Sequence, residues 1–193
     1  MSGWGTFLQP FGPFALPVAG GRTAQLPWHQ CSYRREALPL GRELETLLEN
    51  EGLLHARLHE AGHTLVLELG CVAAHLNPSR LRSLVAFAWH GGRLWGAGRA
   101  AYERWTRARR AAHAALVLHT VARELRLRMA DVQRVIPERR RRVAPVLSLA
   151  IAIHAAGEVA GVLLGPGTAA VPIAHIELNR RAHLRRGEAQ TRS

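Results

Sequence analysis

The chain has 193 residues, enough for one domain with a sizeable core, and hydrophobic residues make up 48% of it, as in folded globular proteins. Its formal net charge is +12, and every basic residue other than histidine is arginine, because the sequence contains no lysine. This absence excludes a Walker A phosphate-binding loop, a Schiff-base lysine and a kinase-type lysine. Two cysteines, Cys31 and Cys71, do not make a disulfide framework, and we expect a cytoplasmic protein.

The charge is distributed unevenly along the chain. Residues 1–76 contain 5 arginines and 7 acidic residues, a net charge of −2. Residues 77–193 contain 21 arginines and 7 acidic residues, a net charge of +14. We therefore expect the C-terminal portion to attract polyanions such as nucleic acid, anionic lipid head groups or an acidic protein.

The N-terminal segment, residues 1–38, is rich in glycine, proline and aromatic residues, and its prolines interrupt regular structure. We expect an irregular arm that packs its aromatic side chains onto the rest of the molecule. Those side chains are Trp4, Phe7, Phe11 and Phe14. Residues 39–178 should form a helical domain that opens with a short amphipathic helix over 39–50, and residues 179–193 should form a frayed basic tail.

The stretch 53–76 contains His59-Glu60-Ala61-Gly62-His63, an H-E-x-x-H motif in an apolar, helix-forming context. Leucine and valine recur there at helical spacing, which predicts one helix around which the domain is organised. Residues four apart share a helix face, so His59 and His63 can present two imidazoles to one Zn²⁺. Glu60 can then reach a metal-bound water, and His55 extends the histidine stripe by one turn.

The chemistry that this motif predicts is metal-assisted hydrolysis of a protein or peptide substrate. The zinc ion would polarise the scissile carbonyl and lower the pKa of its bound water to about 7. Glu60 would take the proton from that water and deliver it to the leaving amine. The alternative interpretation is an interaction protein in which the motif is structural and its side chains belong to the core.

The segments after Asn77-Pro78 predict further helices. Asparagine is a good helix cap and proline suits a first turn, so a helix should span 78–90 and stop at Gly91-Gly92. A long helix should follow over 99–129, and a short one should end before Pro137. Residues 120–136 also resemble a helix-turn-helix, which would make the chain an arginine-rich nucleic-acid-binding or regulatory protein.

Residues 143–164 are the most apolar stretch and are long enough to span a membrane. His154 and Glu158 interrupt it, so we expect a central buried helix and treat membrane association as the less favoured alternative. Four consecutive arginines, residues 139–142, precede this helix, where their charge opposes the helix dipole and favours a bound anion. Residues 168–178 are expected to form one short strand.

Three segments together resemble the FtsH-type zinc peptidase domain. The H-E-A-G-H motif at 59–63 looks like that family's zinc helix, residues 98–103 (Gly-Arg-Ala-Ala-Tyr-Glu) resemble its G-R-A-A-E-E segment, and residues 131–134 (Asp-Val-Gln-Arg) are similar to its D-L-x-R-A segment. The resemblance implies a mainly helical peptidase with His59 and His63 as zinc ligands and Glu60 as general base. It also implies Asp131 as the third zinc ligand.

The residues themselves leave the third ligand open. No acid follows at the short spacing of thermolysin-like enzymes, and the extended metzincin pattern is absent. Besides Asp131, the acids that remain candidates are Glu103, Glu124 and Glu158. The fold expected overall is a single, mainly α domain around the H-E-x-x-H helix, with an irregular N-terminal arm and at most a short strand near the C-terminus.

Overall fold

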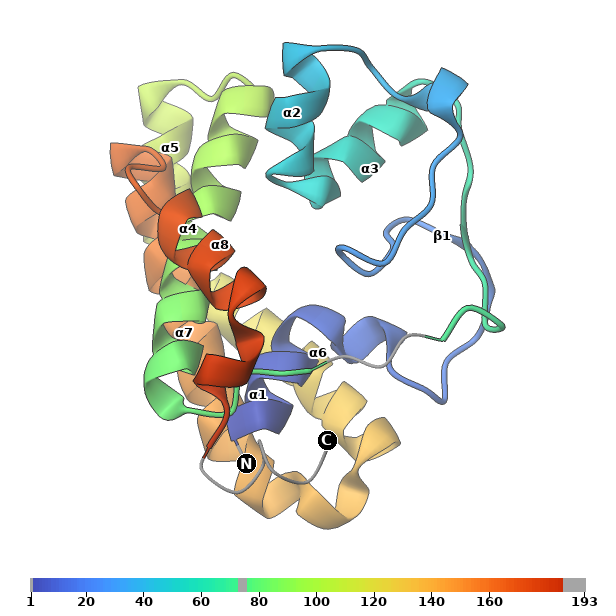
Figure 1. Cartoon of the computed structure of the whole chain (residues 1–193). Coiled ribbons are helices and arrows are strands. Elements are labelled where there is room, and N and C mark those ends of the chain that lie inside the picture. Colours follow the sequence, from blue (N-terminus) through green and yellow to red (C-terminus); the bar gives the residue numbers. More distant parts are fainter. Residues whose placement is uncertain (1, 73–75, 186–193) are drawn as a thin grey trace.

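The computed structural model describes residues 2–72 and 76–185, which fold mainly into helices (Figure 1). The helices are α1 (Ser2–Phe11), α2 (Arg42–Leu48), α3 (Glu51–Glu60), α4 (Leu81–Tyr102), α5 (Arg107–Ala115), α6 (Val117–Val135), α7 (Arg140–Leu164) and α8 (Ala170–Leu178). Strands β1 (Gly21–Thr23) and β2 (Leu65–Leu67) pair antiparallel, with Gly21 opposite Leu67. The mainly α fold class expected from the sequence is confirmed.

Helices α4 and α7 pack together more extensively than any other pair of described elements. Their crossing is unusually close because each helix places two glycines, four residues apart, against the partner's backbone. These glycines are Gly92 and Gly96 on α4 and Gly157 and Gly161 on α7. A Cβ atom at Gly92 would lie only 2.0 Å from the carbonyl oxygen of His154. The helix end predicted at Gly91-Gly92 is therefore wrong: α4 continues, and its glycines serve packing.

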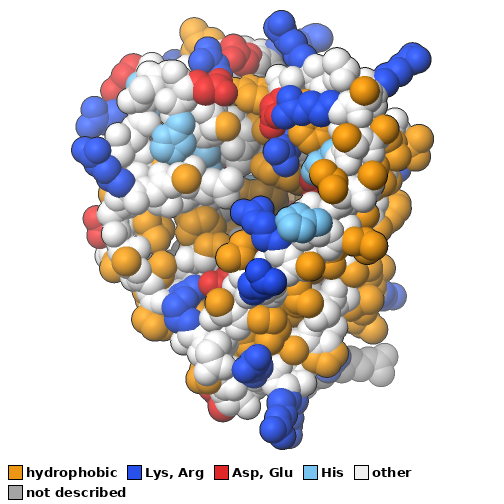
Figure 2. Space-filling model, turned by 180° about the vertical axis from the view of Figure 1, so that it is seen from behind, with side chains coloured by type: hydrophobic (Ala, Val, Ile, Leu, Met, Phe, Trp, Pro, Cys, Tyr) orange, Lys and Arg blue, Asp and Glu red, His pale blue; other side chains and the backbone are white. Residues whose placement is uncertain are grey.

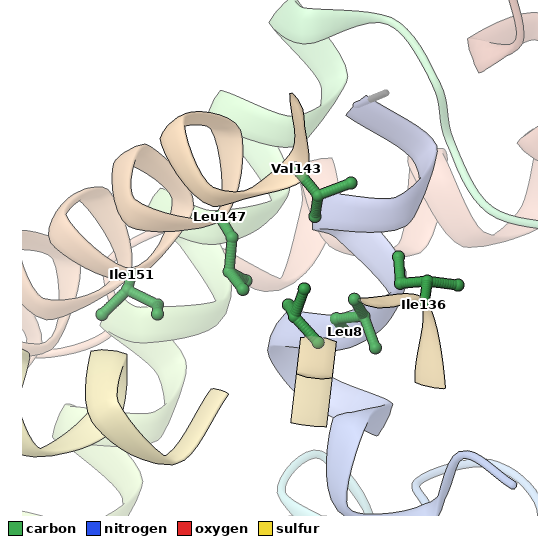
Figure 3. Close-up of a cluster of buried hydrophobic side chains, with 6 residues drawn as sticks. Leu8, Ile136, Val143, Leu147 and Ile151 are labelled. Carbon is green, nitrogen blue, oxygen red and sulfur yellow. The ribbon is translucent and has the colours of Figure 1, made fainter. Parts of the chain in front are cut away.

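The main hydrophobic core lies where α1, α6 and the first half of α7 meet. Its buried side chains are Leu8, Val132, Ile136, Val143, Leu147 and Ile151 (Figure 3). Trp4 and Phe7 of α1 pack against this cluster. The expectation of an irregular arm over 1–38 is therefore wrong for its first part, because residues 2–11 form a helix whose apolar side is buried in the core.

A second cluster of buried leucines holds α2, α3 and β2 together. Its members are Leu47, Leu53, Leu54, Leu58 and Leu65, and Trp95 and Tyr102 of α4 pack against it. These elements form a separate part of the fold beside the α4–α7 pair (Figure 1). The fully buried His55 lies on the same helix as three of these leucines.

Several predicted boundaries differ from the structure. The predicted helix over 99–129 is broken after Tyr102, and α5 begins at Arg107 behind a Thr106 side-chain cap. Residues 120–135 form one continuous helix within α6, so the helix-turn-helix geometry proposed for 120–136 is wrong. No separate short helix begins near residue 130.

The C-terminal segment also differs from its prediction. Residues 170–178 form helix α8 and not a strand, with Pro172 in the first turn, where proline is tolerated. The described part of the tail, residues 179–185, is held against the start of α4, because the backbone N–H groups of Ser79 and Arg80 both donate to the carbonyl of His183. Residues 186–193 of the predicted tail lie outside the described residues, as do residues 73–75 of the predicted motif helix.

Candidate functional site

The helix that carries the H-E-x-x-H motif ends inside the motif. Gly62 adopts a left-handed φ of +83°, and its N–H donates to the carbonyl of His59 at 2.9 Å. The N–H of His63 donates to the carbonyl of Leu58, also at 2.9 Å. This pair of bonds with glycine in the left-handed region is the Schellman motif, which closes an α-helix. The expected helix over 53–76 is therefore wrong beyond Glu60.

This ending places the motif's three polar side chains in different surroundings. The imidazole of His59 donates through Nε2 to the carbonyl of Ala24 at 3.2 Å, and the carboxylate of Glu60 accepts from the hydroxyl of Tyr102 at 2.7 Å. His63 lies past the turn and is exposed. His59 and His63 therefore do not share one helical face, which was the geometric basis for assigning them to one metal ion.

Asp131 lies on α6, in the part of the molecule built around α1. Its two carboxylate oxygens accept from Arg128 at 2.5 Å and from Arg134 at 2.8 Å. Arg134 also donates to the backbone carbonyls of Gly12, Ala15 and Pro17. Asp131 thus orients an arginine that fastens the chain after α1, a structural role that the sequence did not reveal.

The alternative third ligands are also engaged elsewhere. Glu103 accepts from Arg99, Arg109 and the Trp105 indole, Glu124 pairs with Arg128, and buried Glu158 pairs with His113 at 2.9 Å. In the described ranges, no three histidine, cysteine or acidic side chains lie close enough together to hold a metal ion. As placed, the predicted residues do not fit a zinc site, and zinc binding by them stays a prediction.

The polar stripe of α3 holds the segment that precedes it. The Glu51 carboxylate accepts from the backbone N–H of His29 at 2.7 Å, and Nδ1 of the His29 ring lies 3.5 Å from its other oxygen. One turn later, Nδ1 of His55 accepts from the N–H of Leu26 at 3.4 Å. Its Nε2 therefore carries the proton and donates to the Tyr33 hydroxyl at 2.8 Å. Two histidines of the stripe predicted as metal-binding, His55 and His59, thus fasten residues 24–33 together with Glu51.

The protonation states follow from this arrangement. Burial lowers the pKa of the His55 imidazole below its usual value, despite the nearby Glu51 carboxylate. The hydrogen bond to Glu51 raises the pKa of His29. Burial alone would raise the pKa of the Glu51 carboxyl, but its hydrogen bonds with His29 outweigh burial, and the pKa of Glu51 is lowered. Burial raises the pKa of the Cys31 thiol, which donates to the carbonyl of Pro27 at 3.0 Å. Cys31 therefore remains a protonated thiol rather than a nucleophilic thiolate.

A different surface stands out on α7. Within the described ranges, residues 137–164 form the one helical stretch long and apolar enough to cross a membrane by length and composition, yet only 44% of its most apolar window is buried. Of the other residues in this helix, some are half-buried, and five exposed apolar residues lie on one side of it. These five are Pro145, Leu149, Ala152, Ala156 and Leu163. Successive members lie within about 60° of one another around the helix axis at 100° per residue, so they form one stripe.

This stripe, which we call the α7 apolar face, contains no charged side chain over about 27 Å of helix at 1.5 Å per residue. Leu149 is 42% exposed and Leu163 is 49% exposed, whereas Glu158 lies on the buried side. Figure 2 shows hydrophobic side chains gathered on the side of the molecule where α4 and α7 lie. The central buried helix expected at 143–164 is therefore buried on one side only.

The arginine run, Arg139–Arg142, lies at the N-terminal end of this face. All four side chains are exposed, and Arg141 and Arg142 point along the same side of the helix as Leu149. Within the described part of the chain, only Arg139 of the four forms an ion pair, with Glu138 at 3.6 Å. The run therefore leaves about three uncompensated positive charges beside an exposed apolar stripe.

Comparison with known proteins identifies no relative: no protein-family model, no curated protein and no solved structure matches this chain. The sequence contained a signal for the α7 apolar face, namely an apolar stretch preceded by arginines, but burial cannot be read from composition alone. The contact between Glu51 and His29 had no recognisable signal in the sequence, because 22 residues separate the two.

Proposed function

We propose that the protein binds the surface of an anionic membrane through the α7 apolar face and the arginine run. The observation that carries the proposal is the exposed, uncharged stripe that begins beside Arg141 and Arg142, which form no ion pair with any described residue. Amphipathic helices that lie in a bilayer interface combine these features: an apolar face enters the acyl region while basic side chains contact anionic head groups.

The helix lies along the membrane surface and does not cross the bilayer. Its other side is packed into the protein by α1, α4 and α6, and both α4 and α6 carry arginines that hydrocarbon would not solvate. Only one face of α7 is therefore available to lipid. A polar protein packed on one side and lipid on the other is the arrangement of an interfacial helix.

Two energetic terms favour this binding. Each arginine near an anionic leaflet contributes about 1 kcal/mol, so Arg141 and Arg142, which lie on the side of the α7 apolar face, contribute about 2 kcal/mol at low salt. Inserting the exposed parts of Leu149 and Leu163 adds a term of about 25 cal/mol for each square ångström removed from water. The electrostatic term weakens as salt increases, whereas the hydrophobic term does not.

The test is sedimentation with vesicles of phosphatidylglycerol or of phosphatidylcholine. We expect binding to the anionic vesicles, and the Arg141→Gln/Arg142→Gln variant should bind roughly 30-fold more weakly, the equivalent of about 2 kcal/mol. A control variant loses the same charge elsewhere, at the exposed arginines 34 and 35. Equal weakening in both variants would show that only net charge matters and would refute the proposed site.

The hydrophobic part of the proposal is tested by Leu149→Asp, with Leu40→Asp as control, because Leu40 is 80% exposed near α2. Leu149→Asp should weaken vesicle binding at high salt, and Leu40→Asp should not. If the α7 apolar face instead buries against a second copy of the chain, the wild type will be a dimer without lipid and Leu149→Asp will be a monomer. That result would overturn membrane binding as the role of this face.

A further inference from the structure

A cavity of about 280 Å³ lies between α1, the segment that follows it, and the segment after β2. Its walls are mainly apolar, with Gln30, Glu68 and Cys71 as the polar or sulfur-containing exceptions. The aromatic wall consists of Trp4, Phe7, Phe11 and Phe14, and Leu67, Leu69 and Val72 face it. This aromatic cavity is separate from the α7 apolar face, because none of the residues of that face lines it.

The size and lining of the aromatic cavity restrict its ligand. Its volume is about nine times the roughly 30 Å³ that a water molecule occupies in the liquid, which suits a chain of about eight to ten methylene groups. Drug-sized or cofactor-sized ligands generally need larger pockets. The aromatic cavity is open to solvent on one side and mainly apolar within, so a single alkyl chain whose polar end stays in water fits its walls.

The positive charge beside the cavity selects the head group of the ligand. Trp4 lines the cavity, and the guanidinium of Arg139 lies 6.0 Å from the centre of the Trp4 ring. The one acid among the described residues that line the cavity, Glu68, is exposed at its edge and accepts from the N–H of Gly70 at 2.9 Å. An anionic head group on an alkyl chain in the cavity can therefore meet Arg139 beside Trp4.

We infer that the aromatic cavity binds the alkyl chain of a single-chain phosphate lipid whose phosphate contacts Arg139 beside Trp4. The inference deepens the proposed membrane function and rests on it, since Arg139 begins the arginine run that the membrane proposal uses. It assigns the α7 apolar face to the bulk bilayer and the cavity to one particular lipid extracted from it.

Cys71 provides a direct readout because it lines the cavity and its thiol is exposed. We would measure the rate at which maleimide modifies Cys71 in the wild-type protein, without vesicles, using peptide mass mapping. Decyl phosphate at a concentration below that at which it forms micelles is the probe. Cys31, which does not line the cavity, is the internal control.

Decyl phosphate should slow the modification of Cys71 at least fivefold and leave Cys31 unchanged. Inorganic phosphate should have no effect, because it lacks the chain, and decyltrimethylammonium should protect much less, because its charge has the wrong sign. The Arg139→Gln/Arg140→Gln variant should need about tenfold more decyl phosphate for the same protection. The Arg34→Gln/Arg35→Gln variant, with the same loss of charge, should behave as wild type.

An unchanged rate at Cys71 with decyl phosphate would overturn the inference. Equal protection by decyltrimethylammonium would also overturn it, because the arginines would then select nothing. The Leu149→Asp variant separates this result from the membrane proposal: it should lose vesicle binding but keep protection by decyl phosphate. If the wild type does not bind vesicles but decyl phosphate still protects Cys71, only the proposed membrane function is refuted.

Discussion

The close crossing of α4 and α7 makes a sharp prediction at two adjacent glycines. A Cβ atom at Gly92 would lie 2.0 Å from the carbonyl oxygen of His154, whereas one at Gly91 would meet no atom within 4 Å. Real Cβ atoms do not approach other heavy atoms more closely than 3.0 Å, so Gly92→Ala must move the two helices apart by about 1 Å. The largest helix–helix contact in the fold would then lose much of its packing.

We expect Gly92→Ala to lower the free energy of unfolding by about 3 kcal/mol, as overpacking of a close contact does. Gly91→Ala should raise it by up to about 1 kcal/mol, because alanine is the better helix former and nothing opposes its methyl group. Urea unfolding followed by circular dichroism measures both variants. If Gly92→Ala is as stable as Gly91→Ala, the helices are not packed through these glycines and the reasoning is refuted.

Three further predictions concern side chains of the predicted site. Asp131→Ala should lower the free energy of unfolding by about 3 kcal/mol in urea unfolding, because it removes the carboxylate that accepts from both the largely buried Arg128 and Arg134. Glu138→Gln, on an exposed pair, should change it by less than about 1 kcal/mol. The pKa of His55 is lower in the folded protein than in the unfolded chain, so as the pH drops His55 is protonated first in the unfolded chain. The free energy of unfolding should therefore fall as the pH drops below 6.5. His55→Gln should reduce that pH dependence in thermal melts between pH 5 and 7.5, and an unchanged slope would show that His55 does not cause it. The zinc hypothesis predicts one zinc per chain in the wild type, lost in His59→Ala, and elemental analysis that finds no zinc in either protein would contradict it.

The helical class was predictable because apolar residues recur at helical spacing over most of the chain. The ends of the helices were less predictable, since glycine has two uses that a sequence does not separate. Gly62 has a left-handed φ and closes α3, whereas Gly92 and Gly96 lie within α4 and permit the contact with α7. The spacing of four residues, repeated at Gly157 and Gly161, was the available signal for the second use.

The candidate site shows a similar limit. His55 and His59 are on one helix face, as the motif predicts, but their rings bind residues 24–33 of the same chain. A sequence motif specifies which groups share a helix face and not which partner comes to that face. Likewise, the sequence identified α7 as an apolar helix but not which of its sides is exposed. That depends on which elements pack against the other side.

The central claim, that the α7 apolar face enters an anionic bilayer, is tested most directly by an environment-sensitive fluorophore at residue 156. Ala156→Cys places the label on that face, and Leu40→Cys places it on an exposed site near α2, both with Cys31 and Cys71 replaced by serine. With phosphatidylglycerol vesicles, we expect a blue shift at position 156, quenching there by brominated acyl chains, and neither effect at position 40. No change at position 156, or equal changes at both positions, would contradict the account.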